Sequence, residues 1–170
     1  IAVTAVTASK VYDGTAASTS APAITSGSLA TGDTVTWTQT FDSRNVGTAK
    51  TLTPAGTVVD GNSGANYQVT FVPISTGSIT PKALTVTGVT AASKTYDGTT
   101  TATLTTTSAS LGGRVAGDTT TTLVTAAATG TFADRNVGTG KTVQVAGLTL
   151  TGPDATNYSL TQPTTTASIT

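Results

Sequence analysis

"KVYDGT", at residues 10–15, returns almost unchanged as "KTYDGT" at residues 94–99. Asp-Gly is a preferred pair for tight turns, because Gly tolerates a positive φ and Asp hydrogen-bonds its own backbone. A lone Asp beside Gly, with no second carboxylate close in sequence, is more typical of such a turn than of a catalytic acid or a metal ligand. We therefore interpret the phrase as a structural motif of a repeated unit.

Other blocks recur in the same order in the two halves of the chain. They are "ATGDTVT" (30–36) with "VAGDTTT" (115–121), "FDSRNVGTAKT" (41–51) with "FADRNVGTGKT" (132–142), "GANYQVT" (64–70) with "DATNYSLT" (154–161), and "STGSIT" (75–80) with "TTASIT" (165–170). The sequence predicts a first repeat at 1–80, a junction at 81–83 and a second repeat at 84–170. Each repeat is too long for a solenoid coil and has the size of a small independent domain.

Hydrophobic periodicity favours strands throughout. Thr is the commonest residue, and β-branched residues favour strands. Residues 34–41, "TVTWTQTF", place Thr on alternate positions, which predicts a half-buried strand. Strands are also expected over 67–72, 84–89 and 142–150. The predicted fold class is all-β: two tandem small antiparallel β domains, sandwich-like or β-grasp-like, in an elongated array.

The same alternation predicts the core. In the first repeat we expect Val3, Val11, Tyr12, Val35, Trp37, Phe41, Val46, Leu52, Val58, Tyr67, Val69 and Ile79. In the second repeat we expect Val86, Val89, Tyr96, Leu104, Leu123, Val124, Phe132, Val137, Val143, Leu148, Tyr158, Leu160 and Ile169.

The order "SKxYDGT", "GD", "RNVGT", "NYxL", "SIT" resembles the YDG domain of large bacterial surface proteins, and the "TPKALTV" junction is similar to that of the related MBG repeats. The resemblance covers nearly the whole chain twice. It implies a repeat of secreted adhesins and filamentous-haemagglutinin-like proteins, with a stalk-forming or adhesive role, and it supplies no catalytic residues. The motif residues, expected to be structural, are Tyr12, Asp13, Gly14, Arg44, Asn45, Gly47, Asn66, Tyr67, Tyr96, Asp97, Gly98, Arg135, Asn136, Gly138, Asn157 and Tyr158.

Composition argues against several classes of function. Only 9% of residues are charged, and eight basic residues balance eight acidic ones. A neutral chain has no long-range field to attract phosphate backbones, so we expect neither nucleic acid nor an anionic membrane surface as a partner. The chain has no His, Cys or Glu, which disfavours an enzyme, and we expect no cofactor and no metal. No apolar run is long enough to span a bilayer. The absence of Met leads us to expect a piece of a longer protein.

Three constellations have an alternative reading. Arg44 and Arg135 offer donors for a carboxylate or a sugar, although we favour a role in pinning a loop through backbone carbonyls or a nearby Asp. Residues 60–66, "DGNSGAN", resemble the start of a calcium loop but lack its terminal Glu. An internal isopeptide cross-link joining Lys10 to Asn66, and Lys94 to Asn157, is a further hypothesis.

We expect a non-catalytic structural repeat of a bacterial surface adhesin, extracellular and in contact with neighbouring repeats of the same chain. Two alternatives are a self-assembling filament subunit, whose partners are identical chains, and a module that binds host-surface glycan or protein. The sequence does not reveal the ligand, the number of repeats or the strand topology.

Overall fold

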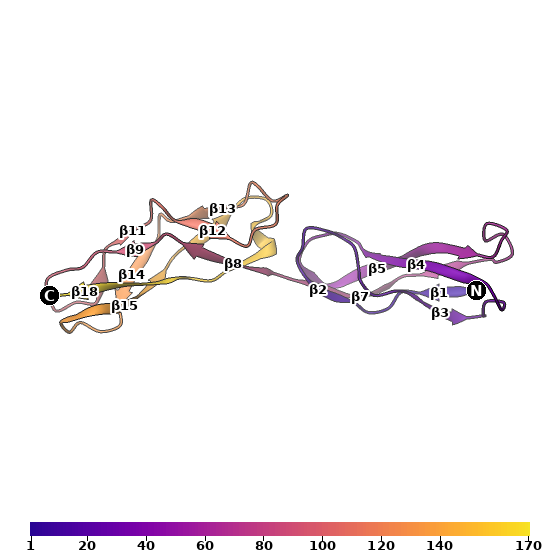
Figure 1. The fold of residues 1–170 in the computed structure, drawn as a ribbon, viewed down its shortest axis with the longest axis horizontal. Coiled ribbons are helices and arrows are strands. Elements are labelled where there is room, and N and C mark those ends of the chain that lie inside the picture. Colours follow the sequence, from indigo (N-terminus) through magenta and orange to yellow (C-terminus); the bar gives the residue numbers. More distant parts are fainter. The chain divides into compact units, whose positions relative to one another are not determined.

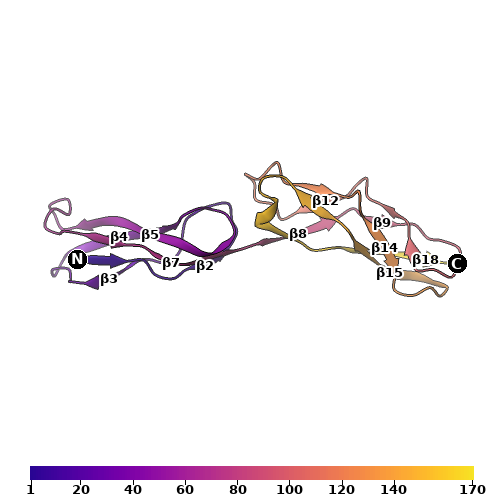
Figure 2. The ribbon, with the colours of Figure 1, turned by 180° about the vertical axis from the view of Figure 1, so that it is seen from behind.

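The computed structural model describes residues 1–170, and the chain forms 18 strands and one short 3-10 helix. The all-β prediction is confirmed. Contacts divide the chain into two compact units, Ile1–Pro81 (unit 1) and Lys82–Thr170 (unit 2). The ribbon is drawn from two sides in Figures 1 and 2.

Unit 1 contains two sheets. Its strands are β1 (Ala2–Thr4), β2 (Ser9–Val11), β3 (Ala23–Ser26), β4 (Thr34–Phe41), β5 (Gly47–Val59), β6 (Thr70–Val72) and β7 (Ile74–Thr80). One sheet has the order β3-β1-β6 and the other β2-β7-β5-β4. The β4–β5 ribbon dominates the second sheet, because all eight residues of β4 pair with β5, from Thr34 with Val59 to Phe41 with Leu52.

Unit 2 contains more strands than unit 1, and one short helix. Its strands are β8 (Lys82–Thr87), β9 (Thr90–Ala91), β10 (Thr101–Ala102), β11 (Leu104–Thr105), β12 (Ser110–Gly112), β13 (Thr122–Val124), β14 (Thr129–Phe132), β15 (Gly138–Ala146), β16 (Thr149–Thr151), β17 (Tyr158–Leu160) and β18 (Thr164–Ile169), with the helix η1 at Ala155–Asn157. The sheets have the orders β10-β14-β15-β18, β12-β8-β17, β11-β9 and β13-β16.

The first and last strands of each unit run parallel. In unit 1, β1 pairs with β6 and β2 with β7, both in parallel. In unit 2, β8 pairs in parallel with β17, and Lys94 forms a parallel bridge with Ile169. A unit therefore begins and ends at opposite ends of its own body, as the two views show for β1 and β7 (Figures 1 and 2).

The core follows the strand alternation in most places. Val3, Leu52, Ile79, Phe132, Val143 and Ile169 are among the buried residues. Leu84 and Val145 are also buried, although they were not predicted. Other predicted positions are only partly buried, namely Val35, Trp37, Val46, Tyr67, Val69, Leu104, Leu123, Val124 and Leu160.

Three core predictions are wrong. Val11 is 57% exposed, because it ends β2 next to the buried Tyr12, and successive side chains of an extended segment point to opposite faces. Val137 is 65% exposed, because it lies in the loop before β15. Tyr96 is 50% exposed, although its N–H donates to the Thr170 carbonyl just as the N–H of the buried Tyr12 donates to the Thr80 carbonyl. Arg44 binds the Tyr12 hydroxyl, whereas the corresponding Arg135 is exposed.

Three predicted strands also differ in their bounds. The strand expected over 84–89 is β8, which begins and ends two residues earlier, at Lys82–Thr87. Pairing in the 67–72 segment begins only at Thr70. The 142–150 segment breaks after Ala146, and β16 begins at Thr149.

Candidate functional site

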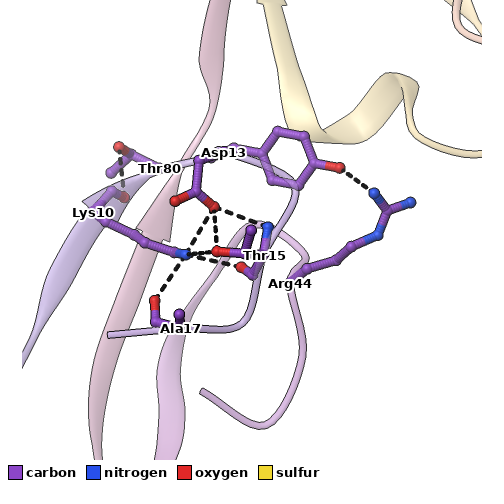
Figure 3. A network of polar contacts seen from close by, with 7 residues as sticks. Lys10, Asp13, Thr15, Ala17, Arg44 and Thr80 are labelled. Atoms are coloured by element: carbon purple, nitrogen blue, oxygen red, sulfur yellow. Dashed lines mark hydrogen bonds and ion pairs between the residues drawn. The ribbon is translucent and has the colours of Figure 1, made fainter. Parts of the chain in front are cut away.

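The repeated phrase forms a closed loop around a lysine in unit 1. Lys10 Nζ donates to Asp13 Oδ1 at 2.8 Å, to the Thr15 carbonyl at 2.8 Å and to the Ala17 carbonyl at 2.9 Å (Figure 3). Asp13 Oδ1 also accepts the Thr15 backbone N–H and the Thr15 hydroxyl, each at 2.9 Å. Gly14 has φ 82°, the left-handed conformation in which L side chains are strained. The ammonium group of Lys10 thus donates hydrogen bonds to residues on both sides of Gly14.

Unit 2 repeats this loop with nearly the same distances. Lys94 Nζ donates to Asp97 Oδ1 at 2.8 Å and to the Thr99 carbonyl and hydroxyl at 2.9 Å. Gly98 has φ 79°. Each lysine lies over a phenylalanine ring, at 5.6 Å for Lys10 and Phe41 and 5.7 Å for Lys94 and Phe132. The loop is therefore a property of the repeated unit.

The loop carboxylates are held in their charged form. At Asp13, partial desolvation opposes ionisation, but hydrogen bonds from Lys10 and Thr15 lower the pKa from 3.8 to about 2. At Asp97, the hydrogen bond from Lys94, followed by those from Thr99, lowers the pKa to about 2. Such an aspartate is a poor proton donor at neutral pH, which suits a fixed counter-ion better than an acid catalyst.

The arginines of "RNVGT" lie differently in the two units. Arg44 Nη1 donates to Tyr12 Oη at 2.9 Å, and its guanidinium lies 5.9 Å from the ring centre of Tyr12, which is buried. The expected acceptors were a backbone carbonyl or an Asp, and the tyrosine hydroxyl was missed. Arg135 is exposed, as is Tyr96.

The remaining "RNVGT" motif residues lie in the loop before the long strand of each unit and at its first position. Asn45 and Asn136 lie in the exposed loop, where Asn136 N donates to Asp134 Oδ1 at 2.8 Å. Gly47 and Gly138 begin β5 and β15, where they pair with Ile79 and Ile169.

A second lysine beside this loop finds its carboxylate at different sequence positions in the two units. In unit 1, Lys50 Nζ lies 2.6 Å from Asp42 Oδ1 and donates to Ser43 Oγ at 2.7 Å. In unit 2, Lys141 Nζ lies 2.5 Å from Asp134 Oδ1. Asp134 aligns with Ser43, whereas Asp42 aligns with Ala133. The ion pair is therefore common to both units, although the acid has moved by one residue.

The "GD" and "NY" blocks meet through a tyrosine hydroxyl. Tyr67 Oη donates to Asp33 Oδ2 at 2.5 Å and accepts the Ala30 N–H at 2.8 Å. Tyr158 Oη donates to Asp118 Oδ2 at 2.7 Å and accepts the Val115 N–H at 3.0 Å. Burial and the bond to Asp118 raise the pKa of Tyr158. Sequence reasoning recognised both blocks but missed this contact between them.

The calcium hypothesis for residues 60–66 is not supported by the loop geometry. Asp60 Oδ1 accepts the N–H groups of Asn62 and Gly64 at 2.8 and 2.7 Å, and Oδ2 accepts the Asn66 N–H at 3.2 Å. The amide of Gly64 and then those of Asn62 and Asn66 lower the pKa of Asp60. The carboxylate thus closes the loop on itself. The structure contains no group of three acidic side chains that could hold a metal ion.

The isopeptide hypothesis is wrong for both pairs. Lys10 lies on β2 beside Ile79, whereas Asn66 lies in the loop before β6, near the other end of unit 1. Asn66 Oδ1 accepts from Asn62 Nδ2 at 3.1 Å. In unit 2, Lys94 bridges to Ile169, while the buried Asn157 ends η1, just before the strand that pairs with the start of β8. The motif residues of each unit therefore form separate structural contacts at its two ends.

One of three comparisons with known proteins gives a match. The sequence model of one family, described as the YDG domain, matches residues 1–76 and again residues 80–167. No curated protein and no solved structure matches the chain. The structure also contains no helix with the length and apolarity needed to cross a membrane.

Proposed function

The chain belongs to the YDG domain family, and from this premise we propose that it is a non-catalytic spacer of a secreted bacterial surface adhesin. In this role the units, in series with neighbouring repeats, hold an adhesive segment away from the cell surface. The expected location is extracellular, at the bacterial surface.

The parallel terminal strands are the observation that carries the proposal. Force applied to the two ends of unit 1 acts along β1 and β6, and along β2 and β7, which pair side by side. The hydrogen bonds of each pair are then loaded together, in shear. Unit 2 has the same arrangement at β8 and β17. Such a geometry suits a module that transmits tension along its own length.

The polar networks support the same role. The loop of Lys10 and Asp13, and that of Lys94 and Asp97, bind only atoms of their own unit, and the loop carboxylates stay ionised. The charged groups of both loops therefore hydrogen-bond within a turn that lies next to the last strand of the unit. The Tyr67–Asp33 and Tyr158–Asp118 contacts close the opposite end of each unit in the same way.

Single-molecule force spectroscopy tests the proposal. The chain has no cysteine, so pairs of introduced cysteines define where force is applied. Handles at residues 1 and 170 load the terminal strands in shear. Handles in a Thr34→Cys/Val59→Cys variant pull apart two exposed, directly paired residues, so the β4–β5 bonds break one after another.

At equal loading rate we expect a higher unfolding force for the terminal handles. Equal or lower forces would remove the support that the strand arrangement gives to a spacer. A glycan or host-protein array addresses the binding alternative. The exposed aromatic side chains are Phe71, 36% exposed, and Tyr96, 50% exposed, and a hit abolished by Tyr96→Ala would replace the spacer with a binding module.

A further inference from the structure

Strand β4 has an open edge in unit 1. Its inner side pairs with β5 along its whole length, and Asp42 N continues this side by donating to the Thr51 carbonyl at 2.9 Å. On the outer side, Phe41 N donates to the Ala16 carbonyl at 2.8 Å, and Ser18 N donates to the Gln39 carbonyl at 3.3 Å. From Trp37 back to Thr34, no strand pairs with the outer side of β4.

The alternation of a strand identifies the open groups. Because the backbone groups of Gln39 and Phe41 point outward, those of Trp37 and Val35 do so as well, while Thr34, Thr36 and Thr38 face β5. The N–H and C=O groups of Val35 and Trp37 therefore form a short row of donors and acceptors without a neighbouring strand.

This edge lacks the usual protection against pairing. Natural edges carry charges, prolines or bulges that prevent association. Residues 34–38 contain only Thr, Val and Trp, and the pairing of β4 with β5 has no register shift. Unit 2 differs at the equivalent place, because residues 125–128 form a turn between β13 and β14 and no continuous strand edge runs there.

The open edge is complementary to itself. We propose that two copies of the chain associate through antiparallel pairing of their β4 strands, with the two-fold axis at Thr36. In this register the outward N–H of Val35 meets the outward carbonyl of the partner's Trp37, and the reverse. Both copies thereby satisfy the same groups, as a two-fold interface requires.

The side chains fit the same register. On the exposed face, Thr34, Thr36 and Thr38 of one copy lie opposite Thr38, Thr36 and Thr34 of the other. On the opposite face, Val35 meets Trp37, an aromatic and β-branched pair that stabilises antiparallel strands. A chain of zero net charge, with no charged residue in this segment, has no repulsion to oppose the contact.

This association goes beyond the spacer role and does not depend on it. It would link neighbouring chains laterally, and the two-fold axis closes the contact at a pair rather than extending it into a filament. Force spectroscopy of single chains and self-association of the chain are separate measurements, so either proposal can fail while the other stands.

A charge exchange at Thr36 tests the register in the full chain. Thr36 is exposed and lies opposite its own copy only in the proposed pairing. Sedimentation equilibrium up to about 1 mM covers the affinities of a small interface. We expect a monomer–dimer equilibrium for the wild type, weaker association for Thr36→Lys alone and for Thr36→Asp alone, and recovery when the two variants are mixed. The mixture should associate about three- to tenfold more tightly than either variant alone.

The matched control is the same exchange at Thr53, an exposed residue of β5 that pairs with Thr40 and lies away from the open edge. Thr53→Lys and Thr53→Asp should dimerise as the wild type does, separately and mixed. A wild-type chain that stays monomeric over the whole range overturns the proposal. A dimer that ignores the charges at position 36, or one that Thr36→Lys weakens without recovery in the mixture, overturns it as well.

Discussion

Gly56 of unit 1 and Gly147 of unit 2 occupy equivalent positions but serve different backbones. Gly56 has φ 141° and stays within the β4–β5 ladder, where it pairs with Trp37. Gly147 has φ 78° and lies beyond the end of β15, facing the turn at residues 125–128. The same residue permits an uninterrupted ribbon in one unit and a break in the other. Glycine is therefore required at both positions because a neighbouring backbone carbonyl lies too close for a Cβ atom, whether or not the strand continues there.

The largest expected effect comes from adding a methyl group at these positions. In Gly56→Ala the new Cβ would lie 2.1 Å from the Thr36 carbonyl oxygen, and in Gly147→Ala 2.1 Å from that of Ala127. Backbone strain and overpacking together should cost each unit about 2–4 kcal/mol. Hydrogen exchange, measured separately for the amides of each unit, should show lost protection in the mutated unit. Equal protection in the variant and the wild type would contradict the equivalence.

The next largest effect is expected at the ion pair of Lys50, whose acid, Asp42, lies one position earlier in the motif than Asp134 does in unit 2. Lys50 has a side chain only 8% exposed, so Asp42→Ala should leave its ammonium short of a partner and cost about 1–3 kcal/mol. The double variant Asp42→Ala/Ser43→Asp copies the arrangement of unit 2 and should recover most of this loss. Chemical denaturation measures both, with Ser43→Asp alone as the control. If the double variant is no more stable than Asp42→Ala, the two arrangements are not interchangeable.

The lysine loops should respond alike in the two units. Lys10→Met and Lys94→Met keep an apolar stem over the phenylalanine ring but remove the ammonium and its bonds. For Lys10, whose side chain is 17% exposed, we expect a loss of about 1–2 kcal/mol, because the freed carboxylate of Asp13 can return to water. Hydrogen exchange should show a loss of similar size in unit 2 for Lys94→Met. A large effect in one unit alone would mean that the shared phrase has different roles.

The smallest expected effect is a change in how the stability of the fold depends on pH in acid. The pKa of Asp13 and that of Asp97 are both lowered to about 2 in the folded chain. A lowered pKa stabilises the fold above the unfolded value of about 4, and this stability is lost as the pH falls towards 2. The Asp13→Asn/Asp97→Asn variant should be less stable than the wild type at neutral pH, and the difference should shrink between pH 4 and 2. Denaturation at several pH values tests this, and a constant difference would assign the acid response to other carboxylates.

The sequence predicted those parts of the fold that depend on local patterns. Thr34–Phe41 alternates and forms β4 with the expected bounds. Its counterpart in unit 2 contains "TAAA" at 125–128, without the Gly or Pro that usually indicates a break, so the division into β13 and β14 was not foreseen. Val11 and Tyr12 were both assigned to the core, although successive side chains of an extended segment point to opposite faces.

The polar contacts were less predictable, because each depends on segments that only the fold brings together. The Asp-Gly turn can be read from two residues, whereas the bond from Arg44 to Tyr12 joins residues 32 positions apart. Tyr158 and Asp118 are 40 positions apart. The Lys50 ion pair was missed for another reason: a nearby Asp was expected to be a partner of Arg44 or Arg135, and the lysines at 50 and 141 were not considered.

The displaced acid also constrains recombination between the gene segments that encode these two related repeats. A crossover that joined the Ala133 codon to the Ser43 codon would produce a domain with no acid beside its buried amine. The reciprocal product would carry two adjacent acids for one amine. Crossovers on either side of this dipeptide keep one acid for each lysine, so viable hybrids of these repeats should inherit the two codons together.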